Sequence, residues 1–511
     1  MSRLMPSLSR SLSLFVVLVL LAGCRVSVRT TSSESAAPLD SLVTVTILQM
    51  NDVYEITPIE AGRRGGLARV ATLRKRLLEK NPNTLTVLAG DFFSPSAMGT
   101  AKVDGERLAG RQMVAVLNTL GLDLATFGNH EFDLKADAFY ERLSESRFAW
   151  TSANVTDTLG RPFPGVRPEY VWTATGPGGR AVRIGFVSVT LPANRKPYVR
   201  YTDPVATMKE AAERLAPRVD AVVGLTHVAL DTDAALAAAV PELDLILGGH
   251  EHENYHLMRG SDDTPILKAD ANARSVYVHE LHVNTVTGEV SVDSRFVPVT
   301  DAIPEDPETA AEVEKWVERA FAGFRAEGFE PEAVVATTTV PLDGREASVR
   351  NHATALTELI AEAMLHAAEG AELAVYNGGS IRIDDVLPPG PVTQYDVIRV
   401  LPFGGDVVSV AVRGDVLARA LDQGVKNRGT GGFLQTANVT RDAATGRWLI
   451  SGEPLRTDRA YVVATSDFLV SGRETGLGFF SLDNPDIGFL ASYGDVRAAV
   501  IAELKRRFGG S

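Results

Sequence analysis

From residue 42 onward, short runs of β-branched and apolar residues alternate with amphipathic stretches of helical length. Alternation of this kind favours α/β layers, in which helices cover the faces of a sheet. The last of these segments is instead typical of antiparallel strands, which we expect to complete the first predicted domain. The predicted strands are 43–48, 84–89, 183–189, 221–225 and 243–247, the first helices are 67–78 and about 113–120, and the closing strands lie within 275–299.

The chain has 511 residues, a length that favours two to four domains. We expect a first α/β domain at 41–300, a charged helical linker at 301–334 and a second, smaller α/β domain at 335–511. Apolar residues make up 45% and charged residues 23% of the chain, which excludes a mainly disordered protein. The net charge of −13 argues against binding to a nucleic-acid polymer. A hinge between the two domains is a further hypothesis.

The N-terminus has the pattern of an export signal. Arg3 and Arg10 precede an apolar run at 12–21, which is too short to span a bilayer, and Leu21-Ala22-Gly23-Cys24 follows directly. This pattern resembles a bacterial lipobox, so we expect a signal peptide at 1–23, a lipid anchor on Cys24 and a flexible tether at 24–40. The alternative is an ordinary signal peptide. The expected location is the periplasmic or cell-surface face of a membrane, and no other membrane-spanning segment is predicted.

Polar side chains follow five of the predicted strands. Because ligands of open α/β sheets bind where strand ends converge, we expect these side chains to meet at one edge. Any one of them alone would more often be a helix cap or a structural histidine. Four of the nine histidines of the chain lie in these segments, which read Asn51-Asp52-Val53-Tyr54, Gly90-Asp91, Gly128-Asn129-His130-Glu131-Phe132-Asp133, Thr226-His227 and Gly248-Gly249-His250-Glu251-His252.

Carboxylate, amide and imidazole groups together form a ligand set for first-row divalent metals rather than for calcium. The set is large enough for two ions, of which Mn, Zn, Fe and Co are candidates. Two ions can clamp the attacking and leaving oxygens of a displacement at phosphorus and activate a water molecule.

These five segments are similar to the motifs of the calcineurin-like metallophosphoesterases. The second unit resembles the C-terminal domain of bacterial 5'-nucleotidases, and the two together resemble the 5'-nucleotidase and UDP-sugar hydrolase family. The second-unit motifs are Asn377-Gly378-Gly379-Ser380-Ile381-Arg382, Leu401-Pro402-Phe403-Gly404 and Gly432-Phe433-Leu434-Gln435.

The resemblance implies a role for each residue of the first unit. It implies one metal ion bound by Asp52, Asp91 and His252, and a second ion bound by Asp91, Asn129, His227 and His250. Asp91 would bridge the two ions. His130 would stabilise the charge on the phosphoryl or leaving group, and Asp133 would hold its imidazole.

One position departs from the family pattern. The family has histidine two residues after the first aspartate, and this chain has Tyr54. A phenol is a poorer ligand at neutral pH unless a metal lowers its pKa. Three outcomes are open: Tyr54 ligates the ion, water or Glu55 fills the position, or the first ion binds weakly. A working site with an altered metal preference is the favoured outcome.

The second unit supplies candidate substrate contacts. A turn at Asn377 followed by Arg382 could bind an anionic group, and Arg350 could add a second guanidinium. Phe433 resembles one face of an aromatic clamp on a nucleobase, although it could equally be a core residue. The family's second clamp motif is absent, and Phe479 is the best substitute.

The resemblance implies an exported, two-metal phosphohydrolase that converts nucleoside 5'-monophosphates to nucleosides and phosphate. Hydrolysis of UDP-sugars or of 2',3'-cyclic nucleotides is the nearest alternative. A binding lipoprotein that has lost catalysis through Tyr54 is the rival from another class. No protein partner can be inferred.

Overall fold

The computed structural model describes residues 41–176 and 179–509 of the chain. The expected signal peptide, the expected lipidation site at Cys24 and the expected tether lie outside these residues. Within the described residues, no helix combines the length and the apolar character needed to cross a membrane.

Two stacked sheets form the N-terminal part of the chain. The first mixes parallel and antiparallel pairing, in the order β10 (Val166–Arg167), β8 (Ala149–Thr151), β7 (Leu124–Thr126), β4 (Thr84–Ala89), β1 (Leu42–Met50), β18 (Ser275–Asn284) and β19 (Val290–Pro298). The second has the order β11 (Glu169–Thr175), β12 (Ala181–Thr190), β14 (Ala221–His227), β15 (Leu245–Gly248), β17 (Thr264–Lys268) and β16 (Tyr255–Arg259). Strands β1, β4, β7, β8 and β10 run parallel, as do β12, β14, β15 and β17.

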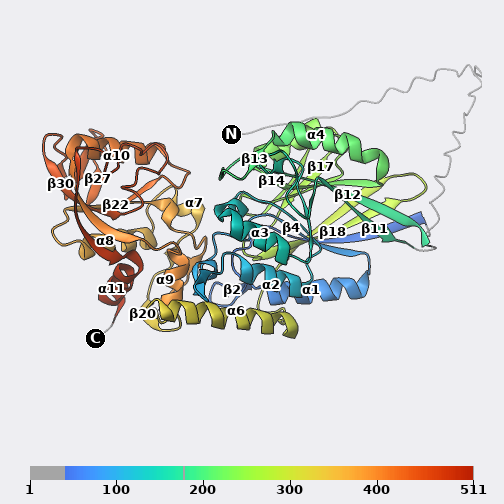
Figure 1. Ribbon diagram of the computed structural model, residues 1–511, viewed down its shortest axis with the longest axis horizontal. Helices are drawn as coiled ribbons and strands as arrows, with labels where there is room; N and C mark the ends of the chain where they lie inside the picture. Colours follow the sequence, from blue (N-terminus) through green and yellow to red (C-terminus); the bar gives the residue numbers. More distant parts are fainter. Residues whose placement is uncertain (1–40, 177–178, 510–511) are drawn as a thin grey trace, which may run out of the picture. The chain divides into compact units, whose positions relative to one another are not determined.

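The side chains of β1 show how the layers pack. Val43, Val45 and Ile47 enter the core between the two sheets, whereas Leu48 and Met50 face the opposite side of the first sheet. Helices cover both outer faces, with α4 on one side and α1 and α2 on the other (Figure 1). The helices of this part are α1 (Leu67–Lys80), α2 (Arg111–Leu120), α3 (Ala136–Glu145), α4 (Pro204–Leu215) and α5 (Leu230–Ala239).

The structure confirms the strands and helices predicted for this part, and β4 spans the predicted residues. The expectation of a single sheet edge is wrong. The strands that carry the polar segments belong to two sheets, β1, β4 and β7 to one and β14 and β15 to the other. Alternating strands and helices indicate a layered fold, but they do not show how the strands divide into sheets. A strand that is buried on both faces is apolar throughout, so its sequence is the same whether it belongs to one sheet or to the other.

The charged segment before residue 334 is a helix, as predicted. Helix α6 (Pro307–Ala326) begins at Pro307, and the Asp306 side chain caps it by accepting a hydrogen bond from the Thr309 amide. Trp316 and Phe324 are buried in the core beneath the first sheet. The helix is therefore packed along its length against α1 and α2 rather than free of the domain.

The C-terminal part contains one mixed sheet with helices on both faces. Its order is β26 (Leu434–Ala437), β22 (Leu373–Asn377), β30 (Ala460–Ser466), β25 (Asp406–Arg413) and β31 (Ile487–Asp495). Helices α8 (Ala355–Ala367) and α11 (Val496–Phe508) pack on one face and α10 (Gly414–Lys426) on the other. Two further helices are α7 (Glu346–Val349) and α9 (Gln394–Val400).

Short two- and three-stranded ribbons complete both parts. They are β2 (Pro58–Ile59) with β3 (Arg64–Gly65), β5 (Lys102–Val103) with β6 (Glu106–Arg107), β9 (Val155–Thr156) with β13 (Arg200–Tyr201), β20 (Val334–Thr338) with β24 (Gly390–Thr393), β21 (Leu342–Asp343) with β23 (Val386–Leu387), and β27 (Val439–Arg441) with β28 (Trp448–Ile450) and β29 (Glu453–Pro454).

Candidate metal centre

The five polar segments lie at the carboxyl ends of β1, β4, β7, β14 and β15. Backbone strain gathers there, because Asp52, Asp91, His250 and His252 all have positive φ angles, of 52°, 58°, 94° and 63°. Non-glycine residues rarely adopt this conformation, and it persists where the surrounding structure holds a functional side chain in place.

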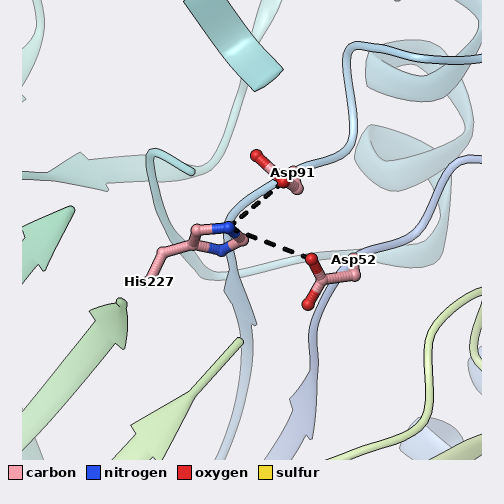
Figure 2. A group of neighbouring side chains, drawn as sticks. All are labelled: Asp52, Asp91 and His227. Atoms are coloured by element: carbon pink, nitrogen blue, oxygen red, sulfur yellow. Dashed lines mark ion pairs between the residues drawn. The ribbon is translucent and has the colours of Figure 1, made fainter. Parts of the chain in front are cut away.

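Asp52, Asp91 and His227 form the centre of the site, and their side chains converge on one point (Figure 2). The His227 Nε2 atom lies 3.1 Å from the Asp91 Oδ2 atom and 3.9 Å from the Asp52 Oδ1 atom. The other ring nitrogen, Nδ1, contacts the Ala89 carbonyl at 2.8 Å. Because that carbonyl can only accept, Nδ1 carries a proton, and Nε2 is the ring nitrogen that faces the two carboxylates.

Two buried atoms of this site have no hydrogen-bond partner among the described residues. They are the His227 Nε2 atom and the Asn129 Oδ1 atom. A buried polar atom without a hydrogen-bond partner destabilises the folded state. In this site such atoms lie beside carboxylate oxygens, which are also electron-pair donors. A cation between them satisfies all of these groups, so the residues present fit a bound metal ion.

Tyr54 and His252 extend the cluster. The Tyr54 hydroxyl lies 3.0 Å from the His252 Nε2 atom, 3.3 Å from Asp91 Oδ2 and 3.4 Å from Asp52 Oδ1. The His252 Nε2 atom also lies 3.4 Å from Asp52 Oδ1. Tyr54 therefore directs its oxygen into the centre of the ligand set. The ring of His250 lies 5.5 Å from that of His227 and completes the group.

The ionisation of these groups reflects burial and mutual charge. Burial alone would lower the pKa of His227, but Asp91 and Asp52 raise it to about 9. Burial, followed by His227, lowers the pKa of His250 to about 4, so this imidazole is neutral and can act as a ligand. Burial and the two carboxylates raise the pKa of Tyr54 well above its ordinary value. The site thus stabilises positive charge at its centre.

Two glycines allow the strand-end loops to approach closely. A Cβ atom at Gly128 would lie 2.1 Å from Asp91 Oδ1, and one at Gly90 would lie 2.4 Å from the Gly128 nitrogen. Gly90 also has a φ of 76°. A larger residue at Gly128 would displace Asp91, and one at Gly90 would displace the Gly128 backbone, which explains the sequence Gly-Asp and Gly-Asn at these two strand ends.

His130 lies beside the cluster, and its Nδ1 atom is 2.7 Å from Asp133 Oδ2. Asp133 in turn accepts hydrogen bonds from Ser94 Oγ at 3.1 Å and from Asn194 Nδ2 at 3.0 Å. These contacts fix the orientation of the imidazole. Its Nε2 atom points away from Asp133 and lies 3.4 Å from a guanidinium nitrogen of Arg382, which comes from the C-terminal part.

Glu131 lies within the motif that follows β7, and no role for it was expected from the sequence. This buried carboxylate accepts hydrogen bonds from four backbone amides, those of Asp91, Phe92, Phe93 and Gly128. It therefore ties the loop after β4 to the loop after β7. The sequence offered one usable signal, a glutamate directly following two candidate site residues in a loop.

A second missed group is the buried cluster of Lys268, Asp233 and Glu251. The Lys268 Nζ atom contacts Asp233 Oδ2 at 2.7 Å and also Glu251, and it donates to the carbonyls of Val228 and Gly249 at 2.7 and 2.8 Å. Lys268 thus anchors the loops after β14 and β15, beside His227 at the end of β14 and beside His250 and His252 in the second loop. A lysine at the end of an apolar strand gave no distinguishing signal in the sequence.

Lys268→Met is expected to lower the free energy of unfolding by about 3 to 5 kcal/mol, because it leaves the Asp233 carboxylate buried without its partner. Thermal unfolding followed by circular dichroism measures the effect. Lys209→Met is the matched control, since the Lys209 pair with Glu213 is exposed and contributes about 0 to 1 kcal/mol. Equal stability of the two variants would contradict the anchoring role.

The C-terminal part places its two candidate arginines beside one glutamate. Arg350 and Arg382 both contact Glu346, Arg382 at 3.6 Å. Asn377 accepts a hydrogen bond from Ser380 Oγ at 2.7 Å and donates one to Glu474 Oε2 at 2.8 Å. Glu474 belongs to the segment that departs from the family pattern, so that segment remains connected to the Asn377 turn.

The two candidate aromatic residues have different surroundings. Phe433 is 9% exposed, and the Arg428 guanidinium lies 5.6 Å from its ring centre. Phe479 packs partly on the core beneath α10, and the Arg419 guanidinium lies over its ring at 3.7 Å. Arg419 therefore covers one face of the Phe479 ring.

Two cavities flank the site. One of about 420 Å³ reaches His252 and is lined by charged side chains of both parts, among them Glu251, Arg274, Arg345 and Asp384. The other, of about 500 Å³, reaches Asp133 and Ser94 and includes Phe403 of the C-terminal part. One cavity therefore reaches a candidate metal ligand, and the other reaches the residue that orients His130.

Comparison with known proteins gives two family matches. Residues 45–254 match the calcineurin-like phosphoesterase family, and residues 334–480 match the 5'-nucleotidase C-terminal domain. The chain is 26% identical to 5'-nucleotidase of Bos taurus over 490 residues, which cover 84% of this chain and 83% of the relative. It is 25% identical to snake venom 5'-nucleotidase of Naja atra over 91% of this chain and 96% of that protein.

Among solved structures, the chain is similar to a 5'-nucleotidase precursor from Thermus thermophilus. The two share 25% sequence identity with a TM-score of 0.73, covering 91% of this chain and 96% of the other. The match to the calcineurin-like phosphoesterases and the Asp and His cluster make this protein a phosphoric ester hydrolase with two divalent metal ions as cofactors. The chain belongs to the 5'-nucleotidase family, with a calcineurin-like metallophosphoesterase domain followed by a 5'-nucleotidase C-terminal domain.

Proposed function

We propose that the protein hydrolyses nucleoside 5'-monophosphates to nucleosides and phosphate. The observation that carries the proposal is the convergence of Asp52, Asp91 and His227 beside the His130 and Asp133 pair. The relatives named 5'-nucleotidase support the substrate class, since they align with both domains.

The ligands divide into two sets that share Asp91. Asp52, Asp91 and His252, with the Tyr54 oxygen among them, would hold one ion, and Asp91, Asn129, His227 and His250 the other. When bound, the two ions supply an activated water nucleophile and electrostatic stabilisation of the oxygens at phosphorus. Neutral imidazoles and carboxylates suit Mn, Zn, Fe or Co.

The residues of the chain orient the substrate. His130, oriented by Asp133, donates a hydrogen bond to the phosphoryl or leaving oxygen as negative charge develops there. Arg382 lies 3.4 Å from His130, so its guanidinium reaches the same point from the second domain and can bind a phosphate oxygen. Arg350 and Asn377 would extend this contact, and Phe433 and Phe479 would face the base. The substrate thus lies between the domains.

The Tyr54 position decides the properties of the first ion. The Glu55 carboxylate lies 3.5 Å from Arg399 and accepts a hydrogen bond from Tyr395 at 3.3 Å, and these contacts argue against Glu55 as the missing ligand. The proposed ligand is therefore the Tyr54 oxygen, which lies among Asp52, Asp91 and His252.

Tyr54→Phe is expected to weaken binding of one ion by at least about tenfold and to leave the other unchanged. Even groups that contact a ligand rather than the ion contribute about 10- to 100-fold. Metal stoichiometry and isothermal titration calorimetry measure the effect, and Tyr277→Phe controls for loss of a buried hydroxyl at a distance from the cluster. Unchanged affinity for both ions in Tyr54→Phe would contradict ligation by the phenol oxygen.

The proposed location is the periplasmic or cell-surface face of a bacterial membrane, through a lipid on Cys24. The lipobox pattern supports the anchor, and the similarity to a venom protein supports export. Metabolic labelling with a radioactive fatty acid tests the anchor. The expected label disappears in Cys24→Ser, and an unlabelled wild-type protein would contradict the anchor.

The substrate proposal is tested with a panel of AMP, UDP-glucose and 2',3'-cyclic AMP, using metal-loaded protein and product chromatography. The expected result is the highest kcat/KM for AMP. Preference for UDP-glucose or for the cyclic nucleotide would overturn the choice of substrate and retain the two-metal chemistry. Binding of nucleotide without turnover of any substrate would identify a catalytically inactive binding protein.

A further inference from the structure

The structure also connects the metal centre to the C-terminal domain through a residue to which the family resemblance gave no role. The His252 Nδ1 atom lies 2.7 Å from the Oδ2 atom of Asp384. His252 belongs to the loop after β15, whereas Asp384 follows the Asn377 to Arg382 turn in the C-terminal domain. The two residues are 132 positions apart in the sequence.

The contact determines which nitrogen of His252 faces the metal centre. Asp384 is a carboxylate and can only accept, so Nδ1 carries the donated proton. The Nε2 atom, with its lone pair, then faces Asp52 Oδ1 at 3.4 Å and the Tyr54 oxygen at 3.0 Å. A carboxylate behind a ligating imidazole fixes the ring orientation and increases its basicity.

Asp384 is itself held in place. It is 6% exposed, and its Oδ1 atom accepts a hydrogen bond from the Glu346 amide at 2.8 Å. Its φ angle is 42°, a conformation that non-glycine residues rarely adopt. The Arg274 guanidinium of the N-terminal domain lies 4.0 Å away. A fixed acceptor of this kind can position the His252 ring.

His227 shows the contrast between the two metal ligand sets. Its Nδ1 atom contacts the Ala89 carbonyl at 2.8 Å, which lies in the same domain. His252 instead takes its acceptor from the other domain. With Tyr54 in place of a second histidine, His252 is also the only imidazole in the first of the proposed ligand sets.

We propose that Asp384 is a positioning residue that orients His252 for the first metal ion, so that affinity for this ion depends on contact between the two domains. The inference rests on the two-metal site of the proposed function. It assigns to the C-terminal domain a share in building the metal centre, in addition to binding substrate.

The test uses the full exported chain with Asp384→Ala and Asp384→Asn. Affinity for Co²⁺ is measured by chelator competition, together with the visible absorption spectrum of the bound ions. Asp384→Ala is expected to lose about 10- to 100-fold in affinity for one ion and to change its absorption bands. Asp384→Asn keeps a hydrogen-bond acceptor, so its loss is expected to be smaller.

Asp385→Asn is the matched control. Asp385 is the next residue and is also buried, but it pairs with Arg399 and does not contact His252. Its affinity for both ions is expected to equal that of the wild type. Unchanged affinity in Asp384→Ala, or an equal loss in Asp385→Asn, would overturn the inference alone. A wild-type protein that binds fewer than two ions would overturn the proposed function, and the inference with it.

Discussion

Asp91→Ala is expected to abolish metal-dependent turnover, with a loss of at least about 1,000-fold, equivalent to about 4 kcal/mol of activation free energy. Asp91 is the carboxylate shared by both proposed ion sites. Its Oδ2 atom lies 3.1 Å from His227 and 3.3 Å from the Tyr54 oxygen. Its Oδ1 atom accepts a hydrogen bond from the His130 amide at 2.7 Å. One substitution therefore affects both ions and the His130 loop.

The effect is measured as metal content and as phosphate release from AMP on the same preparation. Asp123→Asn is the control, because this partly buried carboxylate accepts a hydrogen bond from the Thr86 amide in the same sheet but lies outside the ligand set. The control is expected to keep both ions and full turnover. Two ions bound at wild-type affinity in Asp91→Ala would contradict the bridging role.

His130→Ala is expected to lower kcat by about 10²- to 10³-fold, the range observed when one donor to a developing oxyanion is removed. Both ions should remain bound, since no ligand is removed. KM should change little, because the contact strengthens only as charge develops. Asp133→Asn keeps a group beside Nδ1 and is expected to lose less.

His366→Ala is the control for this substitution, because His366 is a half-exposed histidine that pairs with Glu503 and lies outside the site. Steady-state kinetics and metal analysis together separate the possible roles. Loss of an ion in His130→Ala would make His130 a ligand, and an unchanged kcat would remove it from the reaction.

Much of the metal centre could be predicted from the sequence because its ligands follow strands in short, recognisable segments. Asp52, Asp91 and His227 all lie at strand ends, and the structure brings them together. The strand pattern could not show that two sheets contribute. β4 and β14 are buried along their whole length. Such strands lack the alternation of apolar and polar residues that would show which face of the strand packs against the core.

The residues that support the ligands could not be predicted in the same way. Lys268 ends a buried strand, and Asp384 lies in another domain, so their contacts depend on the tertiary structure alone. Lysine and aspartate residues usually lie at the protein surface, so neither residue stands out in the sequence as a buried supporting group. Glu131 was within reach of prediction, because it follows His130 directly, but its four backbone contacts require the loops of two different strands.

We propose that this chain, with Tyr54 in its ligand set, is a working two-metal phosphohydrolase. The most direct test is phosphate release from AMP by protein stripped with a chelator and then titrated with Mn²⁺. Turnover should be absent at first, should rise with added metal and should reach its maximum at two ions per chain. Protein that binds AMP but releases no phosphate at any metal ratio would contradict the claim.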